Sequence, residues 1–170
     1  MMALAKQYFP LAFFKGNIAD LPKSHTLTRN SMFYYIALEL LIWANITDVI
    51  EAFIDTFIES LLMFLFIAIM LSYTKSLNLF LQTVTAFLIT ENIISLLAFP
   101  GVFLFDVLAE GYMFYVFIGY FACLIIWFIT IVIYLVKQLL PISTFGCFLV
   151  TMGYFTTTVL GPFLITMVFL

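Results

Sequence analysis

Residues 49 to 73 have the sequence VIEAFIDTFIESLLMFLFIAIMLSY, which carries no charge after Glu59. The hydrocarbon core of a bilayer is about 30 Å thick and takes about 20 predominantly apolar residues in a helix. The stretch therefore predicts a helix that crosses a membrane. Asp48 and, three residues later, Glu51 form a pattern like a capping box, so we expect the helix to begin at Val49.

Four more apolar runs of similar kind surround this helix. They comprise residues 31–47, 77–99, 112–136 and 145–170, and the links between them are short. Together the five runs predict an all-α fold, a polytopic bundle of five transmembrane helices with no soluble domain. Pro100 and Gly101 are expected to end the third helix, whereas Pro162 should kink the fifth rather than end it.

The composition excludes several classes of protein. Hydrophobic residues make up 66% of the chain and charged residues 9%, whereas a soluble domain carries about 25% charged residues. Lipid must therefore cover the outside, which excludes a disordered, disulfide-stapled or nucleic-acid-binding protein. His25, Cys123 and Cys147 are too few for a metal centre of the Cys/His kind. Since no catalytic set, phosphate loop or cofactor fingerprint is recognisable, we expect neither an enzyme nor a protein that binds a metal or cofactor.

The charged residues predict how the bundle is oriented. All bases fall in segments that five crossings place on one side of the membrane: Lys6, Lys15, Lys23, Arg29, Lys75 and Lys137. The opposite side receives only acids: Asp48, Glu51, Asp55, Asp106 and Glu110. Because bases are enriched on the cytoplasmic side of membrane proteins, we expect a cytoplasmic N-terminus and a C-terminus outside.

Residues 1–30 form a basic and aromatic arm before the first helix. Four of its residues are basic, Lys6, Lys15, Lys23 and Arg29, and Asp20 is its one acid. Aromatic residues alternate with the bases, so we expect the arm to lie in the cytoplasmic membrane interface with its bases on lipid headgroups. The arm either anchors the topology or recognises a lipid or protein partner.

Two acidic residues fall well inside the predicted membrane helices. Glu39 lies in the first helix and Glu91, followed by Asn92, in the third, each eight residues before the end of its helix. Both helices are expected to run outward, so the two carboxyls should lie at the same depth, about 12 Å below the outer boundary. If they face each other, repulsion and loss of water favour a proton shared between them.

A line of acids follows one side of the second helix. Its members are Asp48, Glu51, Asp55 and Glu59, at intervals of three, four and four residues. One interpretation is a funnel that leads protons or cations to Glu39 and Glu91. In a second, the acids cap the helix or make hydrogen bonds to Thr, Ser and Tyr of neighbouring helices. In a third, a partner subunit supplies the missing bases.

Small residues recur in the last two predicted helices. The fifth helix carries Gly153, Thr157 and Gly161 at intervals of four, and the fourth carries Gly119 and Cys123 at the same interval. Such stripes let helices approach closely in lipid, where van der Waals packing holds them together. They predict contact between the fourth and fifth helices of one chain or, alternatively, self-association.

The order of these features resembles a known family. A short basic and aromatic arm with Asp20-Leu21-Pro22-Lys23-Ser24 precedes five closely spaced helices, a plan similar to that of the small bacterial membrane proteins grouped with the Yip1 family. The resemblance implies a non-catalytic membrane component that works through partners or lipids, and it assigns no site residues.

From these observations we expect a non-catalytic integral membrane scaffold, assembly or accessory subunit. Its expected partners are membrane lipid and either another protein or further copies of itself, and nucleic acid is not among them. The alternative is a proton- or cation-coupled transporter or channel component that uses the intramembrane carboxylates. The expected location is the bacterial cytoplasmic (inner) membrane, with a eukaryotic endomembrane as the alternative.

Overall fold

The computed structural model describes residues 6–104 and 112–169, and in this part of the chain every regular element is helical, as predicted. The long helices are α2 (His25–Trp43), α3 (Val49–Tyr73), α4 (Phe80–Phe103) and α6 (Tyr112–Leu139). They are followed by α7 (Thr144–Phe155), a π-helical turn (Thr156–Leu160) and α8 (Gly161–Phe169). Short 3-10 helices are η1 (Phe9–Phe13), η2 (Ile18–Asp20) and η3 (Leu77–Leu79). Asp106, Glu110 and Leu170, to which the orientation argument refers, lie outside the described residues.

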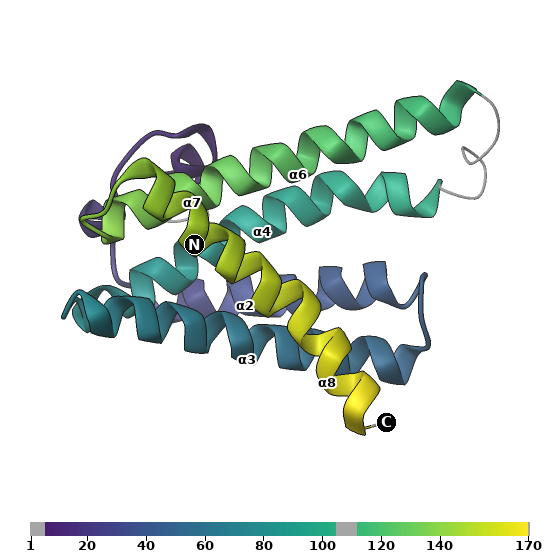
Figure 1. Ribbon diagram of the computed structural model, residues 1–170, viewed down its shortest axis with the longest axis horizontal. Coiled ribbons are helices and arrows are strands. Elements are labelled where there is room, and N and C mark those ends of the chain that lie inside the picture. Colours follow the sequence, from purple (N-terminus) through teal and green to yellow (C-terminus); the bar gives the residue numbers. More distant parts are fainter. Residues whose placement is uncertain (1–5, 105–111, 170) are drawn as a thin grey trace.

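The long helices pack side by side as a bundle (Figure 1). α2 contacts both α3 and α4, and α6 packs against α4. The last segment begins beside α6 as α7 and then crosses the bundle to pack as α8 on α3. Because the chain turns back after each of these helices, the N-terminal arm gathers at the same end as the α3–α4 and α6–α7 links.

Four helical segments are long and apolar enough to cross a membrane. They are Val49–Tyr73, Leu77–Phe103, Tyr112–Leu139 and Thr144–Met167. α2 is not among them; it is shorter and carries His25, Arg29 and Glu39. The chain thus has the character of an integral membrane helical bundle, while the fifth crossing stays a prediction.

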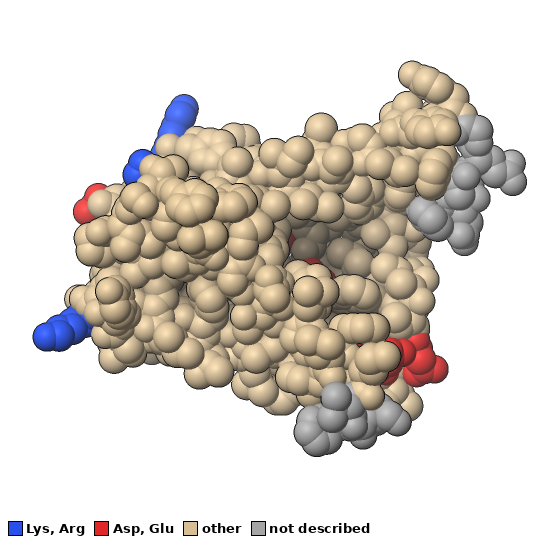
Figure 2. All heavy atoms as spheres, viewed as in Figure 1, with Lys and Arg blue, Asp and Glu red and all other residues tan. Residues whose placement is uncertain are grey.

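Charged side chains gather at the two ends of the bundle. On the face drawn in Figure 2, Lys and Arg atoms project at the end that carries the arm. Acidic atoms lie mainly at the opposite end. The sides between the two ends are almost free of charge on this face, as a lipid-covered surface requires.

The helix boundaries follow the capping residues. α3 begins and ends where the sequence predicts, and the Asp48 carboxylate accepts a hydrogen bond from the Ile50 amide at 2.9 Å. α2 begins six residues earlier than the predicted Ser31, because the Ser24 hydroxyl caps it by accepting from the Leu27 amide. The first predicted helix is therefore shifted toward the polar residues before its apolar run.

Pro100 and Gly101 do not end the third helix, contrary to the prediction. α4 continues through both residues to Phe103. A Cβ atom on Gly101 would lie 2.6 Å from the ring of Phe121 in α6, so the glycine serves a close approach of two helices. Pro100 has no backbone N–H, so the helix lacks one hydrogen-bond donor at this place. Close by, the Tyr120 hydroxyl of α6 donates to the Leu97 carbonyl at 2.5 Å, so a neighbouring helix supplies a donor to this part of α4.

The last helix continues through Pro162, but its regularity breaks one turn earlier. The residues before Gly161 form a π-helical turn, Thr156–Leu160, between α7 and α8. Because proline cannot donate to the carbonyl four residues before it, a wider turn at this place accommodates the missing bond.

The N-terminal arm is part of the bundle. Tyr8, Leu11 and Ile18 are buried. Side chains of α6 hold its backbone: the Trp127 indole donates to the Ala12 carbonyl at 3.1 Å, and the Gln138 side-chain oxygen accepts from the Ile18 amide at 2.8 Å. The arm therefore closes the basic end of the bundle by specific contacts with α6.

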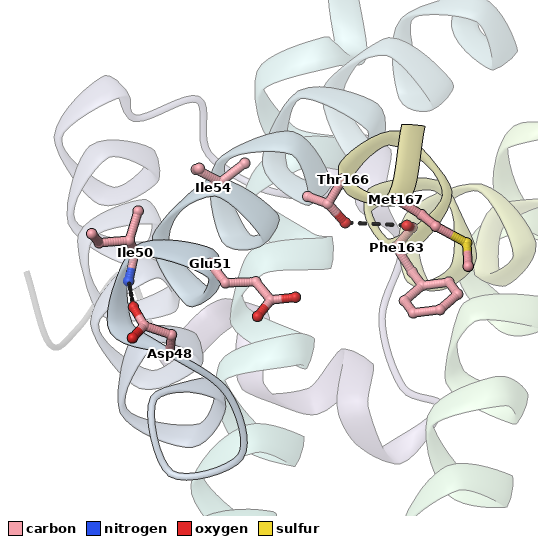
Figure 3. A pocket seen from close by; sticks show the side chains of 7 residues that line it. All are labelled: Asp48, Ile50, Glu51, Ile54, Phe163, Thr166 and Met167. Atoms are coloured by element: carbon pink, nitrogen blue, oxygen red, sulfur yellow. Dashed lines mark hydrogen bonds between the residues drawn. The ribbon is translucent and has the colours of Figure 1, made fainter. Parts of the chain in front are cut away.

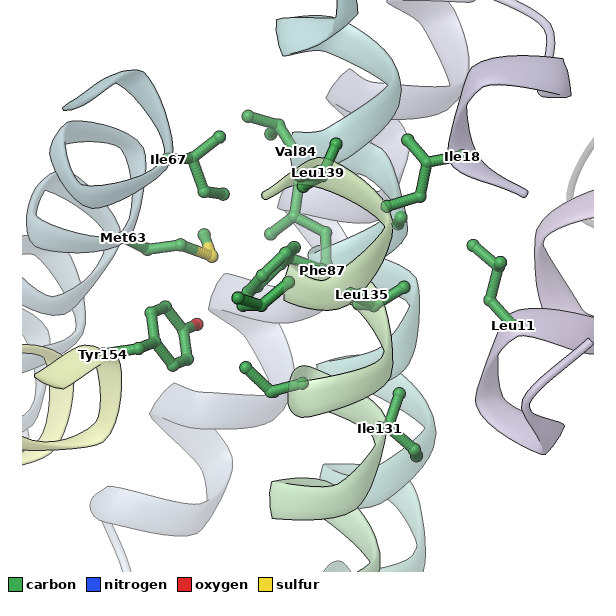
Figure 4. Close-up of a cluster of buried hydrophobic side chains, with 14 of the residues drawn as sticks. Leu11, Ile18, Met63, Ile67, Val84, Phe87, Ile131, Leu135, Leu139 and Tyr154 are labelled. Carbon is green, nitrogen blue, oxygen red and sulfur yellow. The ribbon is translucent and has the colours of Figure 1, made fainter. Parts of the chain in front are cut away.

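A hydrophobic core fills the half of the bundle next to the arm (Figure 4). It joins side chains from the arm and from α2, α3, α4, α6 and α7, among them Leu11, Ile18, Met63, Ile67, Val84, Phe87, Ile131, Leu135, Leu139 and Tyr154. Most of these side chains are completely apolar and fully buried. Polar side chains near the start of α4, among them Gln82, Thr83 and Thr85, are buried at the same end.

Candidate functional site

Three glutamates from three different helices meet inside the bundle. Glu39 comes from α2, Glu59 from α3 and Glu91 from α4, and each carboxyl lies within electrostatic range of the other two. Glu91 is buried, and the other two are half-buried. We refer to these three residues as the carboxyl cluster. The structure thus places Glu39 and Glu91 within electrostatic range of each other and adds Glu59.

Hydroxyl groups of neighbouring helices bind two members of the carboxyl cluster. The Ser95 hydroxyl of α4 donates to a Glu39 carboxylate oxygen at 2.6 Å. The Tyr154 hydroxyl of α7 donates to one oxygen of Glu91. The second Glu91 oxygen is buried and has no hydrogen-bond partner among the described residues. The cluster therefore keeps one acceptor free to bind a proton.

Tyr35 of α2 also belongs to the site. Its side chain is 1% exposed, and its hydroxyl lies within electrostatic range of all three carboxyls. The Tyr35 hydroxyl interacts with the Glu59 carboxyl of α3, without the geometry of a regular hydrogen bond. Tyr35 therefore links α2 to the acid of α3.

Two members of the carboxyl cluster are not completely buried. Glu39 and Glu59 are half-buried although they lie inside the bundle. Figure 2 shows a hollow near the centre of the face, with acidic atoms at its bottom. The hollow opens on the side of the bundle between its charged ends, a surface that a bilayer covers with lipid.

A line of acids connects the carboxyl cluster with the acidic end of α3. Asp48 and Glu51 line a cavity of about 480 Å³, together with Phe163 and Thr166 of α8 (Figure 3). Asp55 follows one turn along α3, beside Thr166. Glu59 follows after another turn, and each step of four residues advances about 6 Å along the helix axis. We refer to Asp48, Glu51 and Asp55 as the acidic line.

Within residues 6–104 and 112–169, no base neutralises the carboxyl cluster. The charged groups that act on Glu39, Glu59 and Glu91 within the described residues are other acids. The Lys and Arg atoms visible in Figure 2 lie at one end of the bundle, away from its centre. In addition, no group of three His, Cys, Asp or Glu residues in the described ranges is arranged to hold a metal ion. The arrangement suits a proton, which needs only one carboxyl oxygen and its hydrogen-bond partners.

The remaining predicted site residues lie elsewhere. Asn92 faces away from the carboxyl cluster, and its side-chain nitrogen donates to the Ser31 carbonyl of α2 at 2.9 Å. Among the bases of the arm, Lys6, Lys15, Lys23 and Arg29 are all exposed. These positions are compatible with contact to headgroups at the basic end.

The small residues of the last two helices face different neighbours. A Cβ atom on Gly161 would lie 2.7 Å from Leu62 of α3, and one on Gly153 would lie 4.0 Å from Phe66 of the same helix. The Thr157 hydroxyl bonds to the Gly153 carbonyl within its own helix. In α6, by contrast, a Cβ atom on Gly119 would meet nothing within 4 Å, and Cys123 is exposed. Gly119 therefore brings α6 close to no other described helix.

Sequence reasoning missed three residues of the site, Tyr35, Ser95 and Tyr154. Two of them had a local signal, since Tyr35 precedes Glu39 by four residues and Ser95 follows Glu91 by four, the spacing of one helix face. Tyr154 has no such signal, because its approach to Glu91 depends on how α7 packs.

Comparison of the chain with protein-family models, with curated proteins and with solved structures finds no match.

Removing the Tyr154 hydroxyl tests the geometry of the site. Tyr154→Phe leaves the buried Glu91 carboxyl without its donor, so we expect the free energy of unfolding to fall by about 1 to 3 kcal/mol. The measurement is thermal unfolding of the purified protein in detergent, followed by tryptophan fluorescence. The control is Tyr73→Phe, which removes a hydroxyl from a side chain that is 80% exposed. Equal unfolding temperatures for both variants would contradict the described contact.

Proposed function

We propose that this protein is a component of a proton-coupled membrane transporter or channel, and that the carboxyl cluster is its proton-binding site. The observation that carries the proposal is the meeting of Glu39, Glu59 and Glu91 without a base, at the inner end of the acidic line. Carboxylates at close range in a poorly hydrated interior repel one another. A bound proton relieves this repulsion.

The acidic line supports a path for protons between the outside and the carboxyl cluster. Its first two members border the cavity at the end of α3, and Asp55 lies between that cavity and Glu59. Acidic groups at such spacing attract protons and shorten each transfer between sites. Water in the cavity would complete the relay.

The hydrophobic core lies on the arm side of the carboxyl cluster. Phe87 precedes Glu91 by one turn of α4, and Ile67 follows Glu59 by two turns of α3, both toward the basic end. This arrangement fits a cluster that is loaded from the acidic end. Release to the other side requires a rearrangement of the helices or a second subunit, and the small number of helices favours an oligomer.

Proton flux into liposomes tests this function. The protein is reconstituted with an internal pH-sensitive dye, and an applied potential drives protons inward. We expect Glu39→Gln and Glu91→Gln each to lower the flux at least about ten-fold, since the amide keeps the shape but cannot take up the proton.

Asp20→Asn is the matched control for the flux measurement. Asp20 is exposed at the basic end, so its replacement removes one carboxylate without touching the path. Flux that stays the same in both glutamate variants, with the proteins folded as judged by circular dichroism, would refute the proposal.

We further propose that α2 forms a fifth crossing, with the N-terminus in the cytoplasm and the C-terminus outside. The separation of bases and acids to the two ends of the bundle supports this orientation. The length of α2 and its packing along α3 and α4 support a crossing. Its interior acid, Glu39, faces the bundle and not the lipid, as is expected of an acid in a transmembrane helix. The location proposed is the bacterial inner membrane, in line with the resemblance to small Yip1-like proteins.

Reporters at the two termini test the number of crossings. An alkaline phosphatase and a green fluorescent protein are fused in turn to each end. Five crossings place the ends in different compartments, so each reporter should be active at only one of them. The same reporter active at both ends would show an even number of crossings and would overturn the orientation.

A non-catalytic scaffold or assembly subunit is the second candidate, and it is favoured by the surface of α6. Of the four segments that are long and apolar enough to cross a membrane, α6 is the least covered by the rest of the bundle. In its most apolar stretch of 18 residues, 17% are buried. Gly119 and Cys123 lie one turn apart on it, the first facing open space and the second exposed. Such a surface suits a helix of another subunit or a second copy of this chain.

Oxidative cross-linking tests self-association through α6. We expect a covalent dimer to form through Cys123 in membranes and to disappear in Cys123→Ser. Gly119→Ile should weaken it several-fold, because the larger side chain keeps the helices apart. Cys147→Ser is the control, since Cys147 is buried. A chain that gives no dimer and stays monomeric in mild detergent would contradict this candidate.

A further inference from the structure

We infer that a groove between α2 and α4 binds an acyl chain of an anionic phospholipid whose phosphate pairs with Lys6. The groove has a volume of about 590 Å³, and its lining includes Lys6, Phe9, Leu38, Asn92 and Ile93. This size is typical of sites that hold small molecules. The inference does not depend on proton transport, since no member of the carboxyl cluster lines the groove.

The walls of the groove fit a hydrocarbon chain. Leu38 of α2 faces Ile89, Ile93 and Leu96 of α4 across it. These four side chains span about two helical turns, roughly 10 Å along the bundle. A groove on the side of a membrane protein is surrounded by lipid, so an acyl chain enters it without crossing water.

The polar groups in the groove do not oppose an apolar ligand. The Asn92 side-chain nitrogen already donates to the Ser31 carbonyl at 2.9 Å. The Asn92 oxygen is buried. Tyr34, which also lines the groove, is exposed, so its hydroxyl remains free to turn toward the interface. A hydrocarbon chain therefore leaves the hydrogen bond between Asn92 and Ser31 intact when it binds.

Lys6 supplies the charge that selects the headgroup. It is exposed, and it lines the groove beside Phe9 of the arm, which docks at the basic end of the bundle. A lysine extends its ammonium group toward the interface while its methylenes stay on apolar surface. Each basic residue near an anionic membrane surface strengthens lipid binding about five-fold. The groove thus combines apolar walls with a positive end, which complement the apolar chains and the negative headgroup of an anionic phospholipid.

Lipid titration of the full-length protein in mild detergent tests the headgroup. Phosphatidylglycerol and phosphatidylcholine with identical chains are added, and binding is followed by native mass spectrometry and thermal stabilisation. We expect wild type to bind phosphatidylglycerol about five-fold more tightly, and Lys6→Gln to abolish this preference. Lys15→Gln, which removes an exposed base elsewhere on the arm, should retain it. An equal loss in both variants would overturn the assignment of Lys6.

Filling the groove tests the acyl chain. Ile93→Phe and, separately, Leu38→Phe should weaken binding of both lipids several-fold, whereas Leu65→Phe on an exposed side of α3 should not. Phosphatidylglycerol with six-carbon chains should bind more weakly than the long-chain lipid. If the short-chain lipid bound equally well, or if both groove variants bound like wild type, the lipid would be held only as part of the general belt around the protein, and the inference would be refuted.

Discussion

A carboxyl group inside a membrane bundle must find hydrogen-bond donors within the protein, because the surrounding hydrocarbon offers none. This constraint organises α2, α3 and α4. On α3 the apolar side chains Phe57, Leu61 and Leu65 are exposed, while Glu59 turns inward to Glu39 and Glu91. Ser95 and Tyr154 donate to Glu39 and Glu91, so they supply hydrogen bonds that the surrounding lipid cannot.

The two halves of the bundle are built from different chemistry. Toward the acidic end, the interior holds carboxyls, hydroxyls and a surface cavity. Toward the arm, it is filled by side chains such as Phe87 and Ile67, and the arm is fastened over it by Trp127 and Gln138. The apolar half supplies close packing, and the polar half supplies binding sites whose hydrogen bonds are incomplete.

Much of this architecture could be predicted, because membrane helices leave a strong signal in composition. The apolar run Val49–Tyr73 gave correct bounds, since its cap lies next to it in the sequence. The end of α4 was wrongly predicted, because Pro100 and Gly101 also fit inside a helix that a neighbour supports, as Phe121 does. Equal depth was predicted for Glu39 and Glu91, and the two carboxyls lie within electrostatic range of each other. Tyr154 was not anticipated, since contacts between distant helices depend on packing that a single sequence does not reveal.

The π-helical turn at Thr156–Leu160 determines which side of the last helix faces α3. Each residue of an α-helix advances the direction of its side chain by about 100°, so one additional residue in a turn offsets everything after it by that angle. Gly153 before the turn and Gly161 after it both meet α3, and Thr166 reaches Asp55. The widened turn thus acts as a phase shift that aligns two α-helical segments on a single neighbour.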